Sequence, residues 1–356
     1  MAKHLIALID GTMVSAAHTE TYASYSNVFE LACLLQIHDE AEDNNPQVVF
    51  YSSGIASQPD TRNVFNLATG NSIVSQIVDQ YTNICANYDF AGRSDKIYLF
   101  GFSRGAMAAR ALAGLISEFG LLSPRDIRHL PVVLTAWNHG WGKGNLPDHI
   151  DLHEVDIEFI GIFDAVMGGI EWLSLFNPIR FSNHQLPLRC RAGVHVVAID
   201  EDRPHFREKL WTGVADGGSA RFFRQIWMPG VHADVGGTGN PVWGRASLLA
   251  MIHYIKEATK LSLDGKWIET KEKKFGQSIR SGSFRISRNS VRWTHKRRPN
   301  GSREMRQYYH PICNLVRNCY YKGSPKKIDW YRAKFRGPFS NTLKVDRFLY
   351  RYFSML

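Results

Sequence analysis

The chain has 356 residues and a formal net charge of +10. That length allows one large α/β domain with an appendage, or two domains of ordinary size, and in either case a substantial buried core. Its five cysteines include no Cys-x-x-Cys pair, which argues against a disulfide framework and against a zinc site. No run of 18 or more apolar residues and no signal-peptide pattern is present, so we expect synthesis in the cytoplasm and no membrane-spanning helix.

Short apolar runs alternate with helix-like stretches along the first 260 residues. Six runs predict buried strands, at residues 5–9, 47–51, 96–102, 157–163, 194–199 and 222–227. Helices are predicted at residues 27–38, 72–88, 106–118 and 243–260. Buried strands that alternate with helices are typical of a mostly parallel sheet with helices on both faces, so the predicted fold class is α/β.

The C-terminal part of the chain differs in charge. From Lys256 to the end there are 25 Lys and Arg against 7 Asp and Glu, a net charge of +18, which leaves −8 for the first 255 residues. We therefore predict a catalytic domain over residues 1–260 and a basic, aromatic-rich region over 261–356, either a separate domain or a peripheral extension. In the latter, FRIS and SVRW are candidate short strands. The charge predicts a polyanionic partner, an anionic membrane surface or nucleic acid, unless it is only a solvated face.

The stretch LFGFSRGAMAAR, residues 99–110, contains a Gly-x-Ser-x-Gly pattern. On a sharp turn from a strand into a helix this pattern is the nucleophile elbow of α/β-hydrolases, where strained backbone holds the serine hydroxyl above the sheet edge. Gly101 and Gly105 stand where a side chain would collide with a neighbouring strand or helix. Because a strand pattern precedes Ser103 and a helix pattern follows it, Ser103 is predicted to be a nucleophile rather than a structural turn residue.

A serine nucleophile needs a histidine base and an acid that orients it. His232 fits best among the 14 histidines, because it follows the run at 222–227 in the glycine-rich segment PGVHADVGG. Two acids each follow a predicted buried strand, Asp164 and Asp200, and Asp234 is a third possibility. Asp164 is the preferred acid, and Asp200 stays open as the alternative.

An oxyanion hole needs two N–H donors aimed at the developing negative charge. One is expected from the backbone of Arg104, the residue after the nucleophile, and the other from Gly11 or Thr12, directly after the first predicted strand. The DGT sequence there also occurs in phosphatases of the Asp-x-Asp-Gly-Thr type, but Leu8 stands where their nucleophilic aspartate would be. Asp10 is instead expected to order the loop by side-chain to backbone hydrogen bonds.

Several segments, taken in order, resemble the DUF2235 family, which includes the catalytic domain of type VI secretion phospholipase effectors of the Tle1 class. They are IDGT, VVFYSSGI, KIYLFGFSRGAMAARALAGLI, GIFDAV, AIDEDRPHF and WMPGVHADVGG, and the match runs over roughly residues 4–255. The resemblance implies an α/β-hydrolase fold and hydrolysis of carboxylic esters, with phospholipids as the substrate of the characterised effectors. It places the nucleophile on Ser103, the acid on Asp164 and the base on His232.

The predicted function is therefore that of a serine hydrolase of phospholipase type, which needs no metal or organic cofactor. Basic clusters in 261–356 would attract anionic headgroups, with aromatic side chains at the interface: Trp267, Trp293, Tyr308, Tyr309 and Trp330. Peripheral membrane association and export by a non-classical secretion system are both compatible with this prediction. The alternative is a nucleic-acid-binding or partner-binding protein that uses the basic region on a hydrolase scaffold.

Overall fold

The computed structural model describes residues 2–12, 25–35, 45–54, 71–92, 95–167, 189–201, 203–211, 222–281, 307–309, 344–345 and 353. One eight-stranded sheet organises this part of the chain, in the order β10-β9-β8-β7-β6-β3-β1-β2. Its strands are β1 (His4–Ile9), β2 (Gln47–Ser52), β3 (Lys96–Phe102), β6 (Ile157–Phe163), β7 (Cys190–Ala198), β8 (Phe222–Met228), β9 (Gln307–Tyr309) and β10 (Lys344–Val345). Every neighbouring pair in this sheet is parallel, so all the strands end at one edge.

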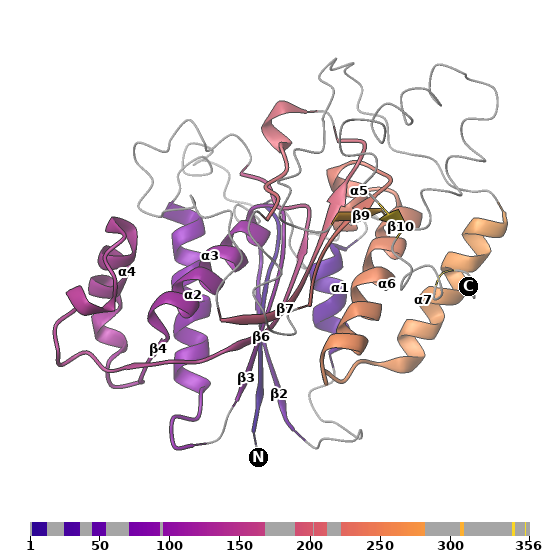
Figure 1. Ribbon diagram of the computed structural model, residues 1–356. Coiled ribbons are helices and arrows are strands. Elements are labelled where there is room, and N and C mark those ends of the chain that lie inside the picture. The colour runs from indigo at the N-terminus through magenta and orange to yellow at the C-terminus, as the bar shows by residue number, and fades with distance from the viewer. Residues whose placement is uncertain are drawn as a thin grey trace, which may run out of the picture.

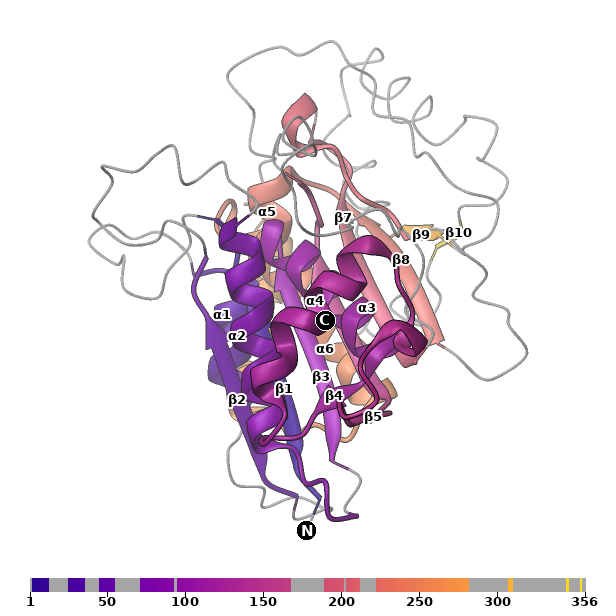
Figure 2. The same cartoon turned by 90° about the vertical axis from the view of Figure 1, so that its left-hand side faces the viewer.

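Helices cover both faces of the sheet, as Figure 1 and the turned view in Figure 2 show. One face carries α1 (Asn27–Leu34), α6 (Pro241–Ala258) and α7 (Gly265–Arg280). The other face carries α2 (Asn71–Asn87), α3 (Arg104–Phe119) and α4 (Leu130–His139). A two-stranded antiparallel ribbon, β4 (Leu121–Leu122) with β5 (Leu152–His153), lies outside the main sheet. The predicted α/β class with a mostly parallel sheet is confirmed.

Five of the six predicted strands are largely buried, and β2, at the edge of the sheet, is half-buried along most of its length. The side chains of β1, for example, divide between the two helix layers: Ile6 and Leu8 belong to the core cluster with α1 and α6, while Leu5, Ala7 and Ile9 belong to the cluster with α2 and α3. Continuous apolar runs are what a sheet covered on both faces requires. The observed bounds equal the predicted ones at β3 and β6 and differ by one residue at β1, β2 and β8. The largest difference is at β7, which begins at Cys190 rather than Val194.

The first helix is shorter than predicted. It begins after Ser26, whose hydroxyl accepts a hydrogen bond from Phe29 N–H, and it ends at Leu34 rather than at residue 38. Leu35 leaves the helical conformation and forms an isolated antiparallel bridge with Leu263. Pairing with the segment that leads into α7 therefore ends α1, which the apolar spacing alone did not indicate.

Helix α7 was not predicted, and it attaches the start of the basic region to the core that contains α1 and α6. Asp264 caps its first turn, and Ile268 and Phe275 are buried in the cluster that contains α1 and α6. Lys271 forms an ion pair with Glu30 of α1, with 2.6 Å between Nζ and Oε1. Further along the chain, β9 pairs with the edge of β8. The domain boundary at residue 260 stays a prediction.

Two other predictions concern the strands of the basic region and membrane-spanning helices. The candidate strands FRIS and SVRW, together with Trp293 and Trp330, lie outside the described residues. Within the described residues, none of the helices has both the length and the apolar character needed to cross a bilayer.

Truncation of Phe275 should test how α7 is attached. Phe275→Ala deletes a buried aromatic side chain, so we expect the free energy of unfolding to fall by about 3–5 kcal/mol in urea denaturation. Lys273→Ala, on the exposed face of the same helix, is the matched control and should change stability by less than about 0.5 kcal/mol. Equal stability of both variants would mean that α7 does not share the core of the sheet.

Candidate active site

Ser103 lies at the turn between β3 and α3, at the edge where the parallel strands end. Its backbone has φ 60° and ψ −124°, an uncommon conformation for a residue with a side chain. The two flanking glycines permit this turn. A Cβ on Gly101 would lie 2.5 Å from the carbonyl oxygen of Gly105, and a Cβ on Gly105 would overlap the carbonyl oxygen of Ile9. Only glycine at both positions lets the strand, the helix and the end of β1 approach this closely.

His232 is the first residue of α5 (His232–Gly236), which follows β8. Its Nε2 lies 2.9 Å from Ser103 Oγ, and its Nδ1 lies 2.7 Å from Asp164 Oδ2. An ionised carboxylate can only accept a hydrogen bond, so Nδ1 carries the proton in this arrangement, and the Nε2 lone pair faces the serine hydroxyl. The structure therefore brings Ser103, His232 and Asp164 into one hydrogen-bonded chain.

Asp164 follows β6, the strand next to β3, and its side chain is fully buried. Its backbone also has a positive φ, 36°. Main-chain hydrogen bonds to β7 hold this conformation: Asp164 N–H donates to Val196 C=O at 2.7 Å, and Ala198 N–H donates to Asp164 Oδ1 at 2.9 Å. One carboxylate oxygen is thus fixed by the sheet, while the other faces His232.

The two other candidate acids are occupied elsewhere. Asp200, at the end of β7, accepts a hydrogen bond from Gly230 N–H and so joins the ends of β7 and β8. Asp234 accepts from the backbone N–H groups of Val231 and Asn240 within the loop that carries α5. Both carboxylates shape the chain around His232, but His232 Nδ1 pairs with Asp164.

Three residues around His232 were not identified from the sequence. The buried Glu201 carboxylate accepts the backbone N–H of His232 at 3.1 Å and forms a two-point ion pair with Arg203, at 2.8 Å on each oxygen. Burial alone would raise the pKa of Glu201, but the hydrogen bonds and charge of Arg203 outweigh it and hold that pKa below its usual range. Phe206 packs against the His232 ring at 4.8 Å, under the Arg203 guanidinium at 3.7 Å.

Glu201, Arg203 and Phe206 all lie in the segment AIDEDRPHF, which is the part of the sequence that could have pointed to them. Their roles depend on how the loop after β7 folds over the neighbouring histidine, and residue spacing does not specify that. Phe102, just before the serine, also contacts the His232 ring and stacks on it with ring centroids 4.8 Å apart and 29° between the planes.

On the other side of Ser103 lies the loop after β1. A Cβ on Gly11 would lie 3.1 Å from Ser103 Cβ, so this loop is directly beside the nucleophile. Gly11 N–H, however, donates to Asp10 Oδ1 at 2.7 Å. Arg104, the other predicted oxyanion donor, begins α3, and first-turn N–H groups have no acceptor within their own helix.

Asp10 is a buried carboxylate with three donors. Besides Gly11 N–H it accepts the hydroxyl groups of Ser26, at 2.5 Å, and Tyr51, at 2.8 Å. Burial raises the pKa of Asp10 to about 6, although these hydrogen bonds act in the opposite direction. The prediction that Asp10 orders the loop through its side chain agrees with this geometry.

A second histidine, His195 on β7, contacts the segment that follows Asp164. Its Nε2 accepts the backbone N–H of Ala165, the residue after Asp164, at 3.2 Å, and its Nδ1 lies 3.4 Å from Gln225 Oε1. Burial, with a smaller contribution from the charge of Arg110, lowers the pKa of His195 to about 3. His195 is thus a neutral structural histidine, in accord with its position inside a strand pattern.

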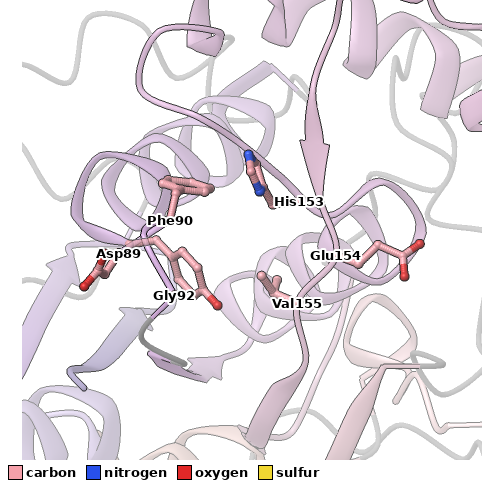
Figure 3. A pocket seen from close by; sticks show the side chains of 7 residues that line it. Asp89, Phe90, Gly92, His153, Glu154 and Val155 are labelled. Carbon is pink, nitrogen blue, oxygen red and sulfur yellow. The ribbon is translucent and has the colours of Figure 1, made fainter. Parts of the chain in front are cut away.

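A small pocket of about 250 Å³ lies elsewhere, between the segments that lead into β3 and β6, and Figure 3 shows it from close by. Tyr88, Asp89, Phe90, Gly92, His153, Glu154 and Val155 line it. Its Glu154 is paired with Lys143 and Arg189, and its His153 with Asp151. The pocket is therefore separate from the Ser103 site.

Comparison with known proteins gives a family match over residues 3–254, to the family described as "T6SS, Phospholipase effector Tle1-like, catalytic domain". The uncharacterized protein YEL023C of Saccharomyces cerevisiae is 30% identical over 239 residues, which are 59% of this chain and 33% of that protein. The chain thus matches about a third of the length of this curated relative.

Two solved structures are also similar. One is an uncharacterized protein from Pseudomonas aeruginosa, 16% identical, with a TM-score of 0.45 over 77% of this chain and 48% of that one. The other is the Tle1 effector bound to the VgrG spike of the type 6 secretion system, 21% identical, with a TM-score of 0.42 over 68% of this chain and 53% of that one.

The neutral state of His195 predicts a pH dependence of stability. Between pH 6.5 and about pH 3 the unfolded chain binds a proton on this histidine that the folded chain does not, so the free energy of unfolding falls as the pH falls, by about 1.4 kcal/mol per pH unit. His195→Gln keeps an acceptor for Ala165 N–H and removes the titration. The stability difference between wild type and His195→Gln, measured in urea at pH 7.5, 6.0 and 4.5, should therefore shift steadily toward the variant; a constant difference would contradict the assignment.

Proposed function

Because this chain belongs to the Tle1-like catalytic-domain family of type VI secretion phospholipase effectors, we propose that it hydrolyses carboxylic ester bonds of membrane phospholipids through Ser103, His232 and Asp164. The observation that carries the proposal is the continuous hydrogen-bonded chain from Ser103 Oγ through both nitrogens of His232 to Asp164. A serine in strained backbone at a strand-to-helix turn, next to a base that is itself oriented by a buried acid, is the arrangement that nucleophilic acyl transfer requires.

The first half of the reaction forms an acyl-enzyme. His232 Nε2 takes the proton from Ser103 Oγ as the oxygen attacks the ester carbonyl carbon, and the carbonyl oxygen becomes an oxyanion. When the tetrahedral intermediate collapses, the bond to the alcohol oxygen breaks and His232 returns the proton to that leaving group. Asp164 stabilises the imidazolium that forms in between and keeps its orientation.

The second half releases the fatty acid. His232 Nε2 takes a proton from water, the hydroxide attacks the acyl carbon, and the second tetrahedral intermediate expels Ser103 Oγ, which takes the proton back. Ser103 and His232 are each only 6% exposed, and Asp164 is fully buried. The charges that develop during both steps are thus largely shielded from water, which strengthens their interaction with the fixed dipoles of the site.

The membrane surface is the proposed partner of the basic region. Within the described residues, α7 carries five Lys and Arg against two Glu over its 16 residues, and its exposed basic side chains include Lys266, Lys273, Lys274 and Arg280. Trp267 lies on the same helix, under the ammonium group of Lys271. Cationic side chains next to an amphipathic aromatic one suit an anionic lipid surface. Export by a type VI secretion system is part of the same proposal.

Nucleic acid is the second candidate partner, and the net charge of +18 after residue 255 is the observation that favours it. If nucleic acid is the partner, the affinity of the protein for DNA or RNA should fall steeply with salt concentration, and binding should not depend on lipid composition.

Removal of the nucleophile or the base should abolish ester hydrolysis. For Ser103→Ala and His232→Ala we expect kcat to fall by roughly 10⁴-fold or more on short-chain aryl esters and on mixed phospholipid vesicles, because the remaining residue cannot act alone. Ser75→Ala, an exposed serine on α2, is the control and should match the wild type. Circular dichroism would confirm that all variants are folded.

The outcome of this experiment separates three possibilities. Fatty acid release that depends on Ser103 supports the phospholipase. Serine-dependent turnover of aryl esters alone would retain the hydrolase and reject the lipid substrate. A folded wild-type protein without serine-dependent turnover on either substrate would contradict the proposed function.

Removal of basic charge from α7 should weaken membrane binding. Because a lysine near an anionic surface contributes about 1 kcal/mol, Lys273→Gln with Lys274→Gln should lower binding to phosphatidylserine-containing vesicles by roughly 30-fold at low salt. Arg125→Gln with Arg128→Gln removes the same charge from exposed positions beside α4, on the other face of the sheet, and is the matched control. Equal loss in both double variants, or tighter binding to DNA or RNA than to vesicles, would argue against docking through α7.

A further inference from the structure

The hydroxyl of Thr12 is buried and has no hydrogen-bond partner within the described part of the chain. Leaving a buried hydroxyl without a partner is unfavourable, and such groups call for a specific explanation. Thr12 follows Gly11, whose position is in contact with Ser103. An unused donor therefore stands one residue from the point of closest approach between the β1 loop and the nucleophile.

The backbone donor expected at this place is engaged. Gly11 N–H points to Asp10 Oδ1 at 2.7 Å, and that carboxylate is in turn held by Ser26 and Tyr51. A carboxylate with three donors in a buried environment is a strong acceptor, and a substrate carbonyl would have to compete with it for the Gly11 N–H. The Asp10 network thus removes Gly11 from the set of available oxyanion donors.

The same network fixes where the loop lies. Main-chain atoms of Ile9 and Asp10 pack directly against Gly105 in the first turn of α3, and Asp10 N–H donates to Ser52 C=O of β2 at 2.9 Å. Residue 11 itself must be glycine, because a Cβ there would lie 2.7 Å from Phe102 Cδ1. The loop is therefore rigid up to Gly11, and Thr12 is the first residue along it that offers a side-chain donor.

We propose that the Thr12 hydroxyl is the second oxyanion donor of the Ser103 site, acting with the backbone N–H of Arg104 in place of Gly11. This inference rests on the proposed function, since an oxyanion forms only if Ser103 attacks a carbonyl carbon. The hydroxyl donates one hydrogen bond to the negatively charged oxygen of each tetrahedral intermediate and transfers no proton. Asp10 acts as a positioning residue, because it holds the loop and occupies the competing Gly11 N–H.

Thr12→Val and Thr12→Ser test the assignment. Valine keeps the shape of threonine without the hydroxyl, so we expect kcat to fall by about 10²–10³-fold, the usual loss for one oxyanion donor, with little change in KM. Serine keeps the hydroxyl, and Thr12→Ser should stay within about tenfold of the wild type. The Thr12→Val protein should melt at or above the wild-type Tm, since it no longer buries an unpartnered hydroxyl.

An alkyl boronic acid gives a readout of the oxyanion itself, because its adduct with Ser103 is tetrahedral and negatively charged. Its inhibition constant should rise in Thr12→Val roughly in proportion to the loss of kcat, and a trigonal, unreactive ester analogue should bind both proteins equally. A structural role for Thr12 would instead lower Tm and weaken both ligands together, which overturns the proposal.

The controls separate this inference from the function on which it rests. If the wild type is active, Ser103→Ala is inactive and Thr12→Val retains kcat within threefold, the oxyanion assignment is overturned and the proposed hydrolase stands. If the wild type has no Ser103-dependent turnover, both are overturned. A loss of kcat that serine restores, with Tm retained, supports Thr12 as the donor.

Discussion

The geometry of the site depends on one main-chain hydrogen bond, from Ser103 N–H to Phe163 C=O at 3.1 Å. It extends the parallel pairing of β3 and β6 by one residue past the end of β3, so the turn into α3 begins with Ser103 still attached to its neighbour. Val166 N–H closes back onto Ser103 C=O at 3.4 Å. Ser103 is thus bonded to Phe163 and Val166, on either side of Asp164 in the chain, and the regular sheet offsets the strain of about 1–3 kcal/mol stored at each of the two positive-φ residues, Ser103 and Asp164.

The polar groups of Asp164 and His232 are held by hydrogen bonds from the surrounding main chain and from Glu201. Asp164 uses one oxygen for the sheet and the other for His232, so the acid cannot rotate without losing a buried hydrogen bond. Glu201 holds the main chain of His232, and Phe102 and Phe206 restrict its ring. The imidazole therefore has little freedom to move, which suits the proposed role of a base that carries one proton between fixed oxygens.

The sequence predicted the strand ends that carry Ser103, Asp164 and His232, because continuous apolar runs identify buried parallel strands and parallel strands share one active edge. It did not predict α7: this helix is mostly charged and polar, and Ile268 and Phe275 are the only large apolar side chains that it fully buries, so few apolar residues mark its buried face. It predicted that Asp10 orders the loop by hydrogen bonds to the backbone, but not that Ser26 and Tyr51 fix that carboxylate, because these two residues come from the cap of α1 and from β2. Local pattern locates reactive groups, while their partners depend on tertiary packing.

The strand order explains why Asp164, the proposed acid, follows β6 although Asp200 ends a strand closer to the histidine. Along the sheet the strands run β3, β6, β7, β8, so β7 lies between the acid-bearing strand and the one that leads to His232. Asp200 and Glu201, just after β7, hold the segment that follows β8 as it passes over the end of β7. Asp200 accepts a hydrogen bond from Gly230 N–H, and Glu201 accepts one from His232 N–H. With the chain turned back over β7 in this way, Nδ1 of His232 faces β6 and Nε2 faces β3. The carboxylate that can meet Nδ1 while Nε2 meets Ser103 is then the one that extends from the strand beside the serine, which is Asp164.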